Sequence, residues 1–226
     1  YKILQCNINT SLFNYAKLAY ELSYNPYDEA INAFQQFIED FPDSEDAKDA
    51  YEFLLKVYLT TKNYDDALAS MDKIKNKDPR MQKAYQSIVY NRAVELFDNR
   101  EFYKAIKSFE LVKKYPVNQD LNDSSQFWIA ESNYNLNNYL LAIENYEKFR
   151  FLNGSILTNE FSDLDFHIGY SYFEKSNPNK ILNGPEQRNQ IEDLKNALKY
   201  FRNYTNEYNL SDSSNYRTAL LRIADA

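Results

Sequence analysis

The chain has 226 residues, 44% of them hydrophobic and 26% charged, which is the composition of a folded protein rather than a disordered one. With 3 glycines and 6 prolines it has too few turn residues for a barrel or sandwich of many short strands, so long helices are favoured. The formal net charge of −7 argues against a protein that tracks nucleic-acid phosphates, and no apolar run approaches the roughly 20 residues of a membrane span.

Two residue types that occur once limit the possible chemistry. Cys6 is the single cysteine, which excludes an internal disulfide and a cysteine-built zinc site. His167 is the single histidine, so a metal site with several histidines is excluded and a serine–histidine–aspartate triad would have to use it. No glycine-rich phosphate loop or dinucleotide fingerprint is present. We therefore predict no cofactor, no metal site and no catalytic residue.

One pattern recurs four times along the chain, each time around a small residue. These residues are Ala30, Ala67, Ala105 and Ala142, separated by 37, 38 and 37 residues. A fixed period of this size is typical of a helical solenoid. An aromatic residue stands three positions before each alanine, and large apolar residues follow it at four and seven positions. Because these offsets share one helical face, each copy predicts an amphipathic helix.

A second helix is predicted upstream of each of these helices. Each alanine is small, which lets another helix cross closely at that point. The matching upstream positions are Ala19, Leu55, Ala93 and Ala130, and a short polar turn separates the two helices. A helix breaker follows each copy, at Pro42, Pro79, Pro116 and Gly154, where we expect the second helix to stop. Each unit is therefore predicted to be a helix, a tight turn and an antiparallel helix.

A fifth copy is stretched. Gly169 and Ala197 take the two small positions, but 28 residues separate them. The excess contains Pro178, Gly184 and Pro185 and predicts an inserted loop over residues 176–190. This loop could cover a binding face, contact a partner, or be a surface insertion without a role, because loop insertions cost little free energy. Residues 213–225 predict the first helix of a further unit.

These residues resemble the tetratricopeptide repeat over roughly residues 11 to 226. The resemblance implies an all-α, right-handed helical solenoid of about five helix-turn-helix units plus a terminal helix, in one domain over residues 1–226. The expected units are 11–42, 44–79, 81–116, 123–154 and 158–208, followed by the helix 213–225. Because the final "TALLRIADA" stops inside an amphipathic pattern, we expect the chain to be a fragment of a longer protein.

Residues 41–74 are similar to the repeats of bacterial periplasmic and outer-membrane-associated members of this family. In those repeats a Phe-Pro-Asp-Ser turn leads into the next helix, and the same four residues stand at positions 41–44. Asp43 or Ser44 would suit the N-cap of that helix, since each side-chain oxygen can accept backbone N–H bonds.

The family binds its ligands on the concave face that the first helix of each unit lines. Projecting that face from the small residues places aromatic and acidic side chains in one groove. The predicted groove residues are Tyr90, Phe97, Asp98, Phe127, Glu131, Tyr134, Phe166, Tyr170 and Phe173. Two interpretations remain open: the aromatic rings anchor an extended peptide or partner helix, or they pack against the inserted loop, a neighbouring repeat or one another.

Other conspicuous residues favour structural roles. Trp128 and His167 stand two residues before a small position, where packing is favoured over ligand contact for the tryptophan and over catalysis for the histidine. A glycosidase would need two carboxylates across a cleft. The paired carboxylates of this chain are Asp65–Asp66, Glu39–Asp40 and Asp163–Asp165. Asp65 and Asp66 begin a predicted helix, where they complement the helix dipole, so catalysis is disfavoured.

The favoured function is a non-enzymatic scaffold that binds a protein or peptide partner in the groove, in cell-envelope assembly or secretion. Neither nucleic-acid binding nor direct membrane insertion is expected. The resemblance implies a bacterial periplasmic or outer-membrane-associated location, with a cytoplasmic one still open, and the oligomeric state is left open. The alternatives are a carbohydrate-binding outer-membrane protein that uses such repeats as its framework, and an all-helical enzyme.

Overall fold

The computed structural model describes residues 2–22, 27–42, 44–60, 63–72, 74, 77–152, 159–207 and 214–225. Within these ranges every regular element is an α-helix, which confirms the predicted fold class, an all-α helical-repeat solenoid. None of the helices in the described ranges is both long and apolar enough to cross a membrane.

The chain divides into two compact units, residues 1–91 and 92–226. The division falls inside helix α5 (Pro79–Asp98). We call them unit 1 and unit 2.

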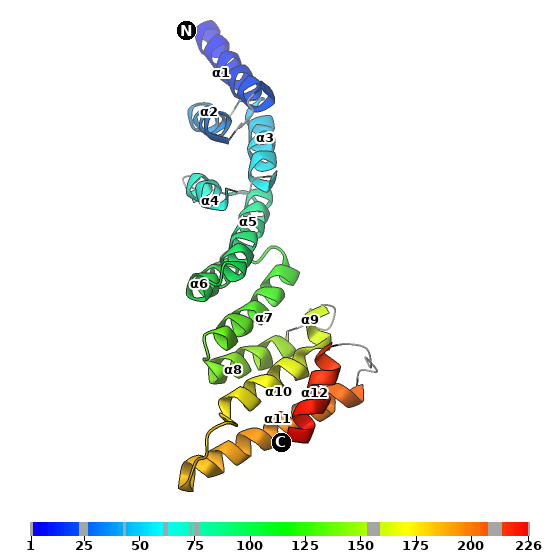
Figure 1. The fold of residues 1–226 in the computed structure, drawn as a ribbon. Helices are drawn as coiled ribbons and strands as arrows, with labels where there is room; N and C mark the ends of the chain where they lie inside the picture. The colour runs from blue at the N-terminus through cyan, green and yellow to red at the C-terminus, as the bar shows by residue number, and fades with distance from the viewer. Residues whose placement is uncertain are drawn as a thin grey trace. The chain divides into compact units, whose positions relative to one another are not determined.

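Unit 1 consists of two helical hairpins and the beginning of α5 (Figure 1). Its helices are α1 (Lys2–Leu22), α2 (Tyr27–Asp40), α3 (Ala47–Thr60) and α4 (Tyr64–Asp72). Helix α2 packs against both α1 and α3. Ala30 and Ala67 are fully buried, as their small size predicts, and so are the large residues four positions later, Phe34 and Met71.

A buried polar cluster connects α2, α3 and α4 in unit 1. The side-chain amide of Gln35 donates to the hydroxyl of Tyr58 at 3.0 Å and to the carbonyl oxygen of Ser70 at 2.8 Å. The hydroxyls of Tyr58 and Ser70 share a further hydrogen bond of 2.8 Å. All three residues are buried, so these hydrogen bonds replace the bonds to water that the polar groups lose on folding.

Unit 2 continues the hairpin pattern. Its helices after α5 are α6 (Phe102–Val112), α7 (Gln119–Asn135), α8 (Tyr139–Arg150), the short α9 (Asn159–Ser162), α10 (Leu164–Lys175), α11 (Gly184–Glu207) and α12 (Ser214–Asp225). Helices α6, α7, α8, α10, α11 and α12 each pack against the next, as Figure 1 shows from green to red. The terminal helix predicted over 213–225 corresponds to α12, and residue 213 lies outside the described residues.

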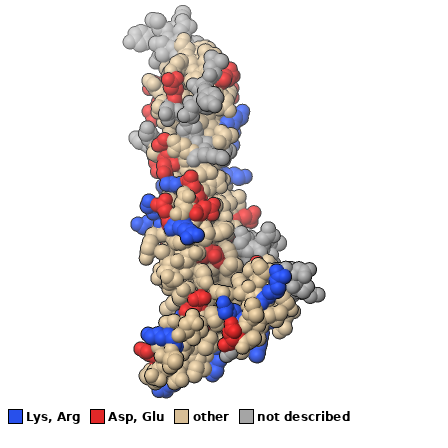
Figure 2. All heavy atoms as spheres, in the orientation of Figure 1, with Lys and Arg blue, Asp and Glu red and all other residues tan. Residues whose placement is uncertain are grey.

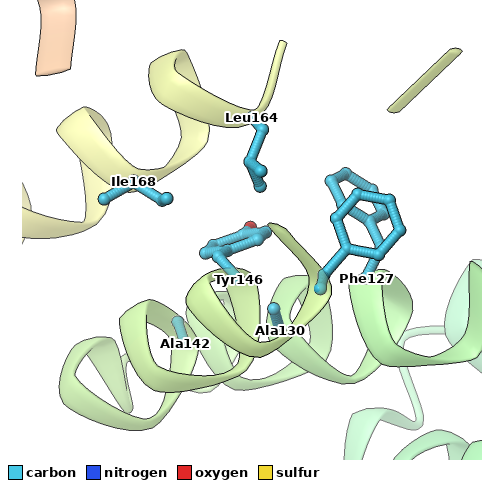
Figure 3. Close-up of a cluster of buried hydrophobic side chains, with 7 residues drawn as sticks. Phe127, Ala130, Ala142, Tyr146, Leu164 and Ile168 are labelled. Atoms are coloured by element: carbon cyan, nitrogen blue, oxygen red, sulfur yellow. The ribbon is translucent and has the colours of Figure 1, made fainter. Parts of the chain in front are cut away.

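The repeated small residues form the core of unit 2. Ala105, Ala142 and Ala197 are fully buried, as the repeat predicts. In Figure 3, Tyr146 of α8 lies between Ala130 and Ala142 on one side and Leu164 and Ile168 of α10 on the other. These residues belong to one cluster of buried side chains, so a large side chain from α8 fills the space that the two alanines leave open.

Three turns of unit 2 contain a residue with left-handed backbone. Arg100 has φ 62°, Asn137 φ 60° and Asn177 φ 52°, and each follows the first helix of a hairpin. After α5, the amide of Glu101 donates to the carbonyl of Leu96, which closes the turn in the way common at helix C-termini. The backbone thus reverses direction without glycine.

Two local predictions were wrong, and one of two alternative N-caps is ruled out. Pro79 begins α5 instead of ending α4, because proline is well tolerated in the first turn of a helix. The predicted loop 176–190 is non-helical only to residue 183, since α11 begins at Gly184 with φ 62°. The Ser44 hydroxyl is buried without a hydrogen-bond partner in the described part of the chain, so it caps no helix. Asp43, the other cap candidate, and Gly154 lie outside the described residues.

Candidate functional site

A pocket of about 250 Å³ opens between α7, α10 and α12 of unit 2. Its lining residues are Glu131, Tyr134, Phe166, His167, Tyr170 and Thr218. Helices α7 and α10 are the first helices of consecutive hairpins, which is the face that the sequence projection assigns to the groove. The pocket therefore lies on the predicted side of the repeats.

The floor of the pocket holds a buried hydrogen-bonded group of three residues, Glu131, His167 and Tyr146. Nδ1 of His167 donates to Oε1 of Glu131 at 2.7 Å. The buried hydroxyl of Tyr146 donates to the same carboxylate oxygen. The Glu131 side chain retains 14% of its exposure, and its second oxygen, Oε2, makes no hydrogen bond within the described residues. One carboxylate oxygen is thus held in place, while the other is left for a ligand.

The charges of the pair stabilise each other. Burial favours the uncharged imidazole, but the hydrogen bond and negative charge of Glu131, with the charge of Asp163, outweigh burial and raise the pKa of His167. Burial also opposes the charge of Glu131, but hydrogen bonds from His167 and Tyr146 and the positive charge of His167 lower the pKa of that carboxyl. Burial and the charge of Glu131 hold the pKa of Tyr146 well above its ordinary value. Each group therefore favours the charged form of the other.

Aromatic rings form the walls. The centroids of Tyr134 and Tyr170 are 6.4 Å apart in an edge-to-face arrangement, and those of Phe166 and Tyr170 are 5.5 Å apart. Burial, together with the negative charges of Glu174 and Glu131, raises the pKa of Tyr134.

Helix α12 is attached to this face by polar contacts. Asp163, just before α10, accepts from the Tyr204 hydroxyl at 2.8 Å and from the Asn215 amide at 3.2 Å. The guanidinium of Arg222 lies 4.8 Å from the Phe173 ring centroid, and its Nη2 donates to the Tyr170 hydroxyl at 3.3 Å. These contacts hold Thr218 at the edge of the pocket.

The structure brings four of the predicted groove residues together in this pocket: Glu131, Tyr134, Phe166 and Tyr170. The other predicted residues are placed differently. Phe127 and Phe173 are buried in the core, with exposures of 4% and 6%. Phe97 packs edge-to-face against Phe102 and Trp128, with centroids 5.3 and 4.9 Å away. Asp98 is exposed, and Tyr90 belongs to unit 1.

Sequence reasoning missed two pocket residues, His167 and Thr218. The spacing did contain a signal for His167, because first helices of consecutive units pack side by side. Glu131 follows the small residue Ala130 of one unit directly. It then faces His167, which stands two positions before the small residue Gly169 of the next unit. Trp128, which is equivalent to His167, packs against Phe97 and Phe127 in the way its packing interpretation predicts.

The paired carboxylates of the sequence do not form a catalytic pair. Asp165 is buried and bonded to Arg150, while Asp163 bonds to Tyr204 and Asn215. Asp65 and Asp66 are exposed in the first turn of α4. The described part of the chain also holds no group of three metal-ligating side chains.

The surface of unit 2 carries charges of both signs. On the face in Figure 2, Lys and Arg side chains lie among Asp and Glu side chains. This face therefore offers no single-sign patch of the kind that binds a polyanion through many phosphates.

A tetratricopeptide-repeat family model matches residues 25–81, which include α2, α3, α4 and the first residues of α5. No similar sequence is found among curated proteins. The match and the all-helical fold support a tetratricopeptide-repeat protein. Such repeats generally mediate protein–protein interaction, through the extended surface that their stacked hairpins present.

Proposed function

We propose that this chain is a non-enzymatic scaffold that binds a peptide segment of a partner protein on the α7–α10–α12 face of unit 2. The supporting observation is the pocket between these helices, with aromatic walls and a carboxylate at its floor. Aromatic side chains are effective anchors at protein interfaces because they bury a large area with few rotatable bonds. A surface pocket suits an extended segment that inserts single side chains.

The contacts of the nearby hydroxyls favour binding over catalysis. A nucleophile activated by His167 would need a hydroxyl within hydrogen-bond reach of the free ring nitrogen. The hydroxyls of Ser171 and Thr218 donate instead to backbone carbonyls of their own helices, at 2.8 Å each. The pair of Glu131 and His167 therefore acts here as a fixed polar contact.

The single tryptophan is not available as a platform for a carbohydrate. A sugar platform requires an aromatic face open to the ligand. Trp128, the single tryptophan, packs against Phe97, Phe109 and Phe127 instead.

We also propose a role in the bacterial cell envelope, in assembly or secretion, on the resemblance of residues 41–74 to periplasmic repeats. Fractionation of cells that express the whole natural gene product tests this location. Recovery with the periplasm or outer membrane supports it, and recovery only with the cytoplasm overturns it.

Selection from a library of displayed random peptides tests the binding proposal, with the 226-residue chain as bait. We expect selected peptides to lose at least about tenfold in affinity for Thr218→Tyr, which fills the pocket edge without removing a core contact. Tyr134→Ala/Tyr170→Ala removes two walls and gives the same result. The matched control is Tyr103→Ala, because Tyr103 lies on α6 with 69% exposure. Peptides that bind all these variants as they bind the parent chain would overturn the proposal.

A further inference from the structure

We propose that the pocket between α7, α10 and α12 recognises one cationic side chain, the ammonium of lysine or the guanidinium of arginine, in the bound segment. This inference rests on the proposed function and specifies the chemistry of its partner. Three observations carry it: the size of the pocket, the unused oxygen of Glu131, and the aromatic walls.

The size of the pocket fits one side chain. Its volume of about 250 Å³ is below the roughly 300–1,000 Å³ of typical small-molecule sites. The pocket is also open to solvent, so a side chain can enter while its backbone stays on the surface.

The floor presents a carboxylate that is paired with His167 through one oxygen and has its other oxygen available as an acceptor. Oε1 of Glu131 receives two donors, whereas Oε2 receives none within the described residues. A buried carboxylate gains most from a partner that brings positive charge and N–H donors. Asp163 and Glu174 add negative charge near His167 and Tyr134. An anionic side chain would meet the carboxylate of Glu131, and an apolar one would leave Oε2 without a partner.

The walls present ring faces and edges to the same space. A cation near an aromatic ring is attracted by the ring quadrupole, and the attraction strengthens when water is excluded. The chain itself already shows this contact on the neighbouring surface. The guanidinium of Arg222 lies 5.7 Å from the Tyr170 centroid and 4.8 Å from that of Phe173. The aromatic surface of this face thus already accommodates a guanidinium.

His167 provides a reporter, because it is the single histidine of the chain and lines the pocket. The imidazole carbon-bound proton signal of chain labelled at histidine therefore reports this one site. The probes are blocked peptides Ala-Ala-X-Ala-Ala in which X is lysine, acetyl-lysine or norleucine. We expect the lysine peptide to shift the His167 signal with a Kd in the millimolar range, and the two neutral peptides to bind at least about tenfold more weakly.

Two variants identify the groups responsible. Glu131→Gln keeps the shape of the floor, and Tyr134→Leu keeps an apolar wall without a ring. We expect each to weaken the lysine peptide by about tenfold and to leave the norleucine peptide unchanged. If Glu131→Gln fails to fold, the comparison of the three peptides with the parent chain still decides the question. Equal binding of all three peptides, or an unchanged His167 signal up to about 10 mM lysine peptide, overturns the inference.

The failure of this inference differs from that of the proposed function. If peptides from the random library depend on the pocket but tolerate replacement of their lysines and arginines by norleucine, only the cation inference fails. If the library yields no pocket-dependent peptide and the lysine probe leaves His167 unchanged, both fail.

Discussion

Gly169 of α10 lies directly against the ring of Phe201 of α11. A Cβ atom at Gly169 would stand 2.9 Å from both Cδ1 and Cε1 of that ring, closer than carbon atoms normally approach. Phe201 is fully buried, so its ring has no room to retreat. The other hairpins carry Ala19, Leu55, Ala93 and Ala130 at this position, so glycine is particular to the fifth.

We therefore expect Gly169→Ala to destabilise unit 2 by about 1–3 kcal/mol, the range typical of overpacking a filled core. Alanine has a higher helix propensity than glycine, which offsets part of the cost of overpacking. Trp128 lies in unit 2, so urea unfolding followed by its fluorescence measures the free energy. The double variant Gly169→Ala/Phe201→Leu should recover part of the loss, because leucine frees space for the methyl group. If Gly169→Ala is as stable as the parent chain, the close approach of α10 and α11 is wrong.

Arg100 gives a prediction of the opposite sign. Its φ of 62° is a left-handed conformation that costs a residue with a Cβ roughly 1–2 kcal/mol and costs glycine little. We expect Arg100→Gly to stabilise unit 2 by up to about 1 kcal/mol, because the greater freedom of glycine in the unfolded chain offsets part of the gain. Arg100→Ala serves as the control, since it removes the same charge and keeps the strain. Equal stabilisation by both variants would show that loss of the Arg100 charge, and not relief of backbone strain, causes the effect.

The ion pair of Glu131 and His167 predicts how stability depends on pH. Since folding raises the pKa of His167 above its ordinary 6.5, this residue stabilises the fold fully below that value. The contribution is lost as pH rises through the raised pKa. Since folding lowers the pKa of Glu131 below its ordinary 4.5, its contribution is present above that value. It is lost as pH falls through the lowered pKa. The pair therefore stabilises unit 2 most between these ordinary values.

The alkaline side of this window can be tested cleanly, because the chain has no second histidine to titrate there. We expect the unfolding free energy of unit 2, from Trp128 fluorescence, to fall between about pH 6 and pH 8. His167→Gln should remove this fall, because the glutamine amide can donate to Glu131 but does not titrate. A parent chain whose unfolding free energy stays constant over this range would contradict the assigned pair.

The hairpins could be predicted because a small residue between two helices leaves a periodic trace in the sequence. Ala105 and Ala142 are fully buried, and so are Phe109 and Tyr146 four positions later. Turn geometry left no such trace. Arg100 occupies a left-handed position that usually takes glycine or asparagine, so only the hydrogen bonds of the folded turn identify it. The division of the chain inside α5 was also invisible, since the repeat runs through it without interruption.

The projection of the groove behaves in a related way. Helical spacing identifies which face a residue occupies, so Glu131, Tyr134, Phe166 and Tyr170 were assigned to the face on which the pocket lies. It does not show how closely the next helix packs on that face. Phe127 and Phe173 share the projected face but are covered by neighbours, the first by Phe149 and the second by Arg222. Burial of this kind depends on helix separation, which a single repeat pattern does not encode.

The polar cluster of Gln35, Tyr58 and Ser70 supplies the last prediction, for unit 1. Gln35→Leu leaves the buried Tyr58 hydroxyl and the Ser70 carbonyl each without one hydrogen bond, so we expect a loss of about 1–3 kcal/mol. The triple variant Gln35→Leu/Tyr58→Phe/Ser70→Ala removes all the side-chain polar groups together and should be less destabilised than Gln35→Leu alone. Hydrogen exchange measured by mass spectrometry over α2–α4 reports this unit, which contains no tryptophan. Faster exchange in the triple variant than in Gln35→Leu would show that the expected order of stability is wrong. The remaining polar groups of Tyr58 and Ser70 would then stabilise unit 1 even without Gln35.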